Sequence, residues 1–507
     1  MMFPWQRASM EIIPAVGEAQ KLGTELLVLG AFCDGPLTGS ARAVNDRSAG
    51  RLAAKLAQGE LGEAVGATLF TGRLPGVAAK RLLLVGLGRA ETFSDRAYRQ
   101  ALAVVARALN DDPAAEVVVT LAENEVPRRT LSWRMQQAGR ILADSHYDFG
   151  LPDRSVRDER RSIMLLVPQA LTSELVVALR QGVAIGEGVS FAKELGNLPP
   201  DQCTPAFVTR TAEAMARQFG FSIEILGRRE FENHGLATFL ALEQVTGGDC
   251  RLIVLRSDHR MATGRPIVLI GNGMAALEAL PEQQQRLHRA PIRDMRGIGS
   301  VLGAMRTVER LGLALNVVGL IVAGQGEFSR GIGRRPRSAG NRGSTGLEPS
   351  LLGDVLCYAA HFSPSCVIDV AALTRACVVA LGSHVSGLFA NDEALASELV
   401  NCGGVSGDRV WRLPLWDDEL SLTTVRGEAD QAESPPDAIA AASNLARFAT
   451  AYPWAHLDIS GTASTAGRMR RATGRPVPLL AEFLIGRARA APGQPIFPPR
   501  SKTELHS

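Results

Sequence analysis

Lysine is scarce in this 507-residue chain: five lysines, at positions 21, 55, 80, 193 and 502, stand against fifty arginines. None lies between residues 194 and 501, so a function that needs a lysine amine has no candidate there. The seven cysteines are odd in number, scattered and never set in a CxxC pair, which argues against a disulfide framework or a structural zinc site. The net charge of +3 is too small to indicate nucleic-acid binding by itself.

Long apolar runs are also missing. No stretch approaches the roughly 18 uninterrupted apolar residues of a membrane helix, and no apolar segment follows the early arginine at the N-terminus. We therefore expect a cytoplasmic protein without a membrane segment. The sequence has no GxxxxGK[ST], HExxH or GxSxG motif, which argues against a phosphate-binding loop, a helix-borne zinc pair and a nucleophile elbow.

Short apolar runs, bounded by Gly and Pro, alternate with helix-like segments along most of the chain. Such runs are typical of strands in a covered α/β sheet. The first series lies at 26–32, 81–88, 116–122 and 162–168, and the second at 222–227, 251–256, 266–273, 316–324, 366–373 and 456–461. A helical stretch over about 172–195 separates them and ends at paired prolines. We predict an α/β protein with an N-terminal domain (1–168), a linker helix (169–197), a larger domain (198–490) and a tail (491–507).

Eight sequence blocks from residue 194 onward resemble the leucyl (cytosol) aminopeptidase family. They are ELGNLPPDQCTP (194–205), LNVVGLI (315–321), LGDVLCYA (352–359), IDVAALTRACVVALG (368–382), GLFANDEAL (387–395), GDRVWRLPL (407–415), WAHLDISGTA (454–463) and ATGRPVPLLAEFL (472–484). The resemblance implies a smaller macro-like N-terminal α/β domain, a larger C-terminal domain with a central mixed sheet, and a hexamer. It also implies a metallopeptidase with two divalent ions, manganese or zinc.

The metal-binding positions implied by the resemblance are mostly changed. Family members hold the ions with a Lys, three Asp and a Glu. The carboxylates are needed because hard divalent cations are neutralised by anionic oxygens. Only one of these positions, Asp294, matches. Uncharged residues stand at the others: Asn272 for the Lys, Leu277 and Thr345 for two Asp, and Leu347 for the Glu. The catalytic Lys falls among Gln283, Gln284 and Gln285, with Gln284 as the central candidate, and the catalytic Arg falls at Pro349. We therefore predict no catalytic residue and no cofactor.

A rearranged metal site is the alternative. Glu278 lies one residue beyond Leu277, and Glu348 one residue beyond Leu347. These carboxylates would give an active aminopeptidase that uses manganese or zinc to release N-terminal amino acids from peptides. In an extended segment, however, a shift of one residue turns a side chain to the opposite face.

Two further hypotheses concern arginines. Arg375 stands where the family has a Gly, and we expect it to pair with Asp294, since an unpaired buried carboxylate is unfavourable. The alternative is that Arg375 points to solvent. Five arginines lie in a Gly- and Ser-rich loop at 330–342, where they would bind nucleic acid or an acidic partner, or would simply be solvated. No aromatic residue lies among them, which disfavours single-strand binding.

The prediction is therefore a leucyl-aminopeptidase-like protein that is catalytically inactive or severely impaired and acts through assembly or binding. The partners we expect are further copies in a homo-hexamer or an active paralogue, with DNA as a further candidate. A chain without any selected role is disfavoured, because random substitution quickly destabilises a core.

Overall fold

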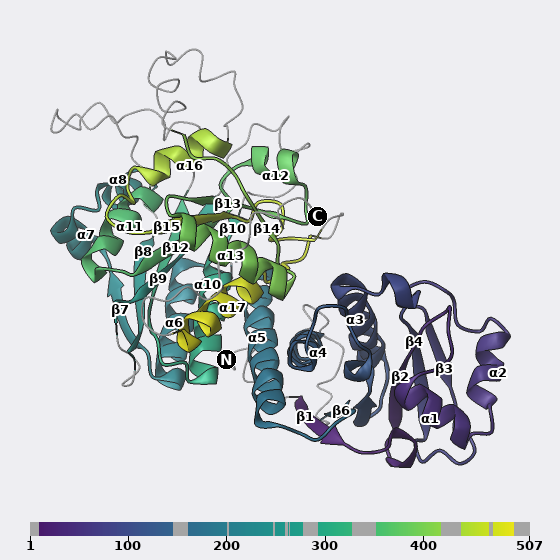
Figure 1. Ribbon diagram of the computed structural model, residues 1–507. Helices are drawn as coiled ribbons and strands as arrows, with labels where there is room; N and C mark the ends of the chain where they lie inside the picture. Colours follow the sequence, from purple (N-terminus) through teal and green to yellow (C-terminus); the bar gives the residue numbers. More distant parts are fainter. Residues whose placement is uncertain are drawn as a thin grey trace, which may run out of the picture. The chain divides into compact units, whose positions relative to one another are not determined.

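The computed structural model describes residues 10–145, 161–199, 202–246, 249–258, 262, 264–276, 293–326, 351–416, 438–465 and 470–490. The chain divides into two compact units, Met1–Ser190 and Phe191–Ser507. The boundary falls inside helix α5 (Ser173–Asn197), the helix expected from the sequence (Figure 1). Each unit contains its own sheet, so the predicted two-domain α/β architecture is confirmed. The precise domain bounds given above remain a prediction.

The first unit is built on a six-stranded sheet with the order β1-β6-β5-β2-β4-β3. All neighbours are parallel except β3, which runs antiparallel to β4 at the edge. The strands are β1 (Glu11–Val16), β2 (Leu26–Ala31), β3 (Thr68–Thr71), β4 (Arg81–Gly86), β5 (Glu116–Val119) and β6 (Ser162–Val167). The helices are η2 (Ala19–Lys21), α1 (Gly39–Arg47), α2 (Arg51–Ala57), η3 (Ala90–Thr92), α3 (Asp95–Asp111), η4 (Leu121–Glu123) and α4 (Leu131–Ser145).

Helices cover both faces of this sheet. Alternate side chains of β2 and β4, such as Leu27 and Leu82, pack in one cluster with Val44 of α1 and Leu52 of α2. The residues between them, such as Val28, point to the opposite face and are also fully buried. Burial on both faces explains why these strands read as continuous apolar runs in the sequence.

The second unit is built on a nine-stranded mixed sheet with the order β14-β13-β15-β12-β9-β11-β8-β7, and β10 pairs with β9 beside this path. The central strands β15, β12, β9 and β11 are mutually parallel. The strands are β7 (Ser222–Leu226), β8 (Cys250–Asp258), β9 (Ile267–Ala276), β10 (Arg293–Asp294), β11 (Asn316–Gly326), β12 (Cys366–Ala371), β13 (Ser386–Ala390), β14 (Val410–Arg412) and β15 (Trp454–Asp458). The helices are α6 (Pro205–Phe219), α7 (Arg228–His234), α8 (Ala237–Thr246), α10 (Arg296–Leu311), α11 (Leu351–Ala359), η5 (Ala360–Phe362), α12 (Arg375–Leu381), α13 (Glu393–Ser406), α16 (Ala438–Ala446) and α17 (Val477–Arg489).

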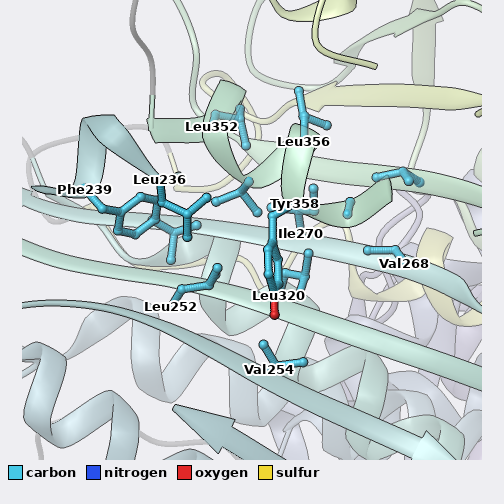
Figure 2. Close-up of a cluster of buried hydrophobic side chains, with 14 of the residues drawn as sticks. Leu236, Phe239, Leu252, Val254, Val268, Ile270, Leu320, Leu352, Leu356 and Tyr358 are labelled. Carbon is cyan, nitrogen blue, oxygen red and sulfur yellow. The ribbon is translucent and has the colours of Figure 1, made fainter. Parts of the chain in front are cut away.

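One face of the central strands carries an apolar core. Figure 2 shows Val268 and Ile270 of β9 with Leu320 of β11, and Leu352 and Leu356 of α11 lie in the same cluster. Side chains alternate along a strand, so the next β9 residue on this face is at position 272. Asn272, one of the positions singled out in the sequence, therefore lies on the same face of β9 as the apolar core.

Helix α5 has the length and composition of a membrane-spanning helix, although 67% of its apolar window is buried inside the protein. The sequence expectation considered only uninterrupted apolar runs, whereas α5 contains Arg180 and Glu187. A buried core helix of a soluble protein passes the same test, so a single such helix is weak support for a membrane segment.

Candidate functional site

The carboxyl ends of the four parallel central strands of the second unit meet at one edge of the sheet. Ligands of α/β proteins commonly bind at this edge, where strands end and loops begin. Asp458 ends β15 and Ala371 ends β12, while Ala276 and Gly326 end β9 and β11. This edge is the candidate site.

Three residues singled out in the sequence have their backbones at this edge. Asn272 lies near the end of β9, in register with Val322 of β11. Asp294 lies in β10, which runs antiparallel to the end of β9, and is in register with Met274. Arg375 begins α12, four residues after β12 ends. The fold therefore brings together three positions that are up to 103 residues apart in sequence.

The other predicted positions lie outside the described residues. These are Leu277, Glu278, Gln284, Thr345, Leu347, Glu348, Pro349 and the arginines of 330–342. The side chains of Asp294 and Arg375 also lie outside the described set, so their ion pair remains a hypothesis.

Asn272 is a polar residue placed against an apolar core. Its Oδ1 is buried and has no hydrogen-bond partner among the described residues. An unsatisfied buried acceptor costs about 1–3 kcal/mol. The amide is neutral, so it also offers none of the positive charge that a lysine would bring to this position.

The opposite face of β9 is closed by the first turn of α10. A Cβ on Gly297 would lie 2.6 Å from the Asn272 carbonyl oxygen and would overlap the Val370 carbonyl oxygen. On the strand side, a Cβ on Gly271 would lie 2.9 Å from the Gly297 carbonyl oxygen. Glycines at both positions let the helix touch β9 and β12, and this contact fixes the backbone on which Asn272 lies.

Asp458 organises the turn that leads into α12. Its carboxylate accepts the Leu373 and Thr374 amides, both at 3.3 Å, and the Ser460 amide at 2.9 Å. The Ser460 hydroxyl donates to the same carboxylate at 2.5 Å. Thr374 in turn caps α12 by accepting the Cys377 amide. Asp458 therefore holds the loop between β12 and Arg375.

A buried polar network lies behind the edge, on β12 and β15. Asp369 accepts hydrogen bonds from His456 Nδ1 and, at 2.6 Å, from Trp454 Nε1. His456 Nε2 is buried and has no partner in the part of the chain that is described. Burial alone would lower the pKa of His456, but the neighbouring Asp369 carboxylate raises it above its usual value.

Asp369, His456 and Asp458 were not singled out in the sequence as site residues, although they lie within two of the quoted blocks. The sequence did contain one sign that these three residues have a special role. Two acidic residues and a histidine within apolar strands are unusual, because buried charges need partners.

Among the residues that the structure describes, no group of three or more His, Cys, Asp or Glu side chains could hold a metal ion. The one donor resolved at the ligand positions is the neutral Asn272 amide. Two adjacent divalent ions require several anionic oxygens.

Sequence comparison finds matches along most of the chain. Residues 190–330 and 349–481 match the "Cytosol aminopeptidase family, catalytic domain", and residues 28–151 match the "Cytosol aminopeptidase family, N-terminal domain". A "Probable cytosol aminopeptidase" of Azoarcus sp. (strain BH72) is 42% identical over 503 residues, covering 95% of this chain and 99% of that protein. A protein of the same name from Aromatoleum aromaticum is 39% identical, covering 96% and 100%.

Solved structures share the fold. A mutant of tomato leucine aminopeptidase superposes with a TM-score of 0.76 at 21% identity, covering 94% of this chain and 97% of that one. The bottromycin maturation enzyme BotP, in a complex with Mn, gives a TM-score of 0.72 at 23% identity, covering 92% and 100%.

Proposed function

Because the chain belongs to the cytosol aminopeptidase family, we propose that it keeps the family's two-domain framework but is catalytically inactive or severely impaired. It would then act through assembly or binding. The observation that carries this proposal is Asn272, a neutral amide with an unpaired buried oxygen at the position where the family has a lysine.

The wider sequence supports the same proposal. Only Asp294 remains of five expected ligands, and no lysine lies between residues 194 and 501 to replace either family lysine. Without anionic ligands, nothing offsets the cost of dehydrating a divalent ion.

An active metal-dependent aminopeptidase is the second proposal, and the relatives favour it over the first. Two relatives, 42% and 39% identical over nearly their whole length, carry the name "Probable cytosol aminopeptidase". This chain would then release N-terminal amino acids from peptides. The manganese in the related BotP structure supports manganese as its metal, with zinc as the other candidate. Glu278 and Glu348 are the carboxylates that such a site would need to recruit.

Hydrolysis of leucine p-nitroanilide by the purified full-length chain, with added manganese or zinc, separates the two proposals. The first proposal expects no turnover and no bound metal by mass spectrometry. The second expects metal-dependent turnover that Glu278→Ala or Glu348→Ala abolishes. Glu60→Ala, which removes an exposed carboxylate of the first unit, is the matched control and should leave turnover unchanged.

Assembly is proposed as a homo-hexamer or as co-assembly with an active paralogue, in the cytoplasm. Three large apolar side chains of the second unit, Val379, Trp411 and Trp416, are exposed and offer contact surface. The cytoplasmic location rests on the relatives, which are named cytosol aminopeptidases. DNA binding would rest on the arginines of residues 330–342.

A further inference from the structure

The first unit contains a cavity of about 930 Å³, located after the ends of β5 and β6, where α4 and α5 begin. Its wall comes from two segments, residues 125–134 before and within α4 and residues 169–175 before and within α5. The volume is in the range of small-molecule sites. All of these residues belong to the first unit, so the cavity is separate from the candidate site of the second unit.

Arg134 is the buried cation of this cavity. It lines the wall with only 7% of its surface exposed. Its Nε and Nη1 are buried and have no hydrogen-bond partner among the described residues. Burial lowers the pKa of Arg134, and nearby Tyr98 and Glu125 oppose this effect. Buried guanidinium nitrogens without partners are costly, and an oxyanion would satisfy them.

Two helices start at the same cavity. Thr130 accepts the Trp133 amide at the start of α4, and Thr172 accepts the Leu175 amide at the start of α5. Each cap satisfies one of the amides that have no acceptor within the first turn of a helix. The remaining amides and the positive ends of both helix dipoles favour an anion at these residues, which line the cavity.

Glycines hold these two helices in close contact. A Cβ on Gly182 of α5 would overlap the Gln136 carbonyl oxygen of α4, and one on Gly139 would lie 2.9 Å from the Leu179 carbonyl oxygen. The Ser132 hydroxyl donates to Glu174 at 2.5 Å and joins the first turns directly. The two N-terminal ends are therefore fixed side by side.

The carboxylates in the wall, Glu125 and Glu174, are exposed, whereas Arg134 is buried. Glu125 interacts with Arg134 through its charge, and Glu174 lies in the first turn of α5. Arg129, a second arginine of the wall, pairs with Asp95 at 2.5 Å, while Arg128 is exposed. The positive charge of Arg134 therefore lies in the buried part of the wall, and the carboxylates lie in its exposed part.

We propose that this cavity binds the phosphate group of a small molecule, with Arg134 and the first turns of α4 and α5 as its donors. A guanidinium presents two parallel N–H donors to a phosphate, and a doubly charged group gains most from two helix N-termini. The ligand is either free phosphate or a phosphomonoester.

The test is calorimetric titration of the full-length chain with inorganic phosphate and with glycerol 2-phosphate, in sodium chloride of matched ionic strength. Arg134→Met should weaken phosphate binding at least about tenfold, since one charge-assisted contact typically contributes that much. Arg51→Met removes an exposed arginine outside the cavity and should bind like the wild type. Tighter binding of glycerol 2-phosphate would identify a phosphomonoester, and equal or weaker binding would identify free phosphate.

Thermal unfolding gives a second measurement. Phosphate should raise the Tm of the wild type by roughly 2–6 °C relative to chloride, and Arg134→Met should lose that rise without a lower Tm in chloride. Should Arg134→Met fail to fold, Arg134→Lys keeps the charge, lacks the planar fork and should also weaken binding. Absence of phosphate binding by the wild type, or binding unchanged in the folded Arg134 variant, would overturn the proposal.

Discussion

Gly297 lies so close to Asn272 that an added Cβ would be 2.6 Å from the Asn272 carbonyl oxygen. Because the obstacle is backbone, no side-chain rotation relieves it. We predict that Gly297→Ala destabilises the protein by about 1–3 kcal/mol through overpacking, measured as a fall in Tm.

The matched control for this prediction is Gly404→Ala in α13. A Cβ at Gly404 would meet nothing within 4 Å. Alanine is the better helix former, so this substitution should leave the Tm unchanged or raise it. Equal losses from the two substitutions would contradict the close contact between α10 and β9.

The unpaired amide oxygen of Asn272 gives a second prediction. Asn272→Leu removes a buried acceptor that has no described partner and extends the apolar cluster, so the free energy of unfolding should stay equal or rise. Asn391→Leu is the contrast, since that amide donates to the Ala449 and Tyr452 carbonyls and accepts the Trp454 amide. Asn391→Leu should lower the free energy of unfolding by about 1–3 kcal/mol. Chemical denaturation of both variants provides the comparison.

The buried pair of His456 and Asp369 predicts a pH dependence. Burial has the largest single effect and lowers the pKa of His456, but Asp369 and Asp458 together raise it by more, so the folded value is above the unfolded value of about 6.5. A folded pKa above the unfolded one gives stability that is complete below the unfolded pKa and is lost as pH rises through the folded pKa. The Tm of the wild type should therefore fall relative to that of His456→Gln as pH rises above about 6.5.

His384→Gln is the control for this pH profile. His384 is exposed, and its replacement leaves the buried pair intact. The variant should keep the wild-type slope of Tm against pH. A wild-type slope that survives in His456→Gln would assign the pH dependence to other groups.

Exposed apolar side chains predict self-association. Trp411 is 64% exposed and Val379 88% exposed, and an interface over them would remove this apolar surface from water. Light scattering after gel filtration should give a mass about six times the 54.0 kDa of the chain. Val379→Asp should lower the mass if this surface is an interface, whereas a wild-type mass of 54.0 kDa would exclude the hexamer.

Most of the framework could be predicted from the sequence, because its strands are buried on both faces. All ten apolar runs correspond to strands, from β2 to β15. Five of the described strands were not predicted. Three of them lie at sheet edges, which carry little of the apolar pattern: β1 contains Pro14, β3 has four residues with alternating exposure, and β14 has three residues. β10 has only two residues, and the buried β13 begins with Ser386 and Gly387, which leaves a short apolar run.

The backbones of Asn272, Asp294 and Arg375 lie at one sheet edge, and their role as site residues remains a prediction. The contacts within this edge could not be predicted from the sequence. The hydrogen bonds of Asp458 join residues 84 and 85 positions apart, and no local pattern reveals such a pairing. The unpaired nitrogens of Arg134 depend on burial, which a single arginine in a sequence does not report.

The strand order of the second sheet has a consequence for the chain as it leaves the ribosome. β15 lies between β12 and β13, yet it is made more than 60 residues after either of them. Until Trp454–Asp458 has emerged, the hydrogen-bonding edge of β12 is open and β13 has only β14 beside it. During this part of synthesis the apolar edge of β12 is open to pairing with other chains, which favours aggregation. A chaperone that covers this edge would be needed most at this stage. A chain that stops before residue 454 cannot close this sheet.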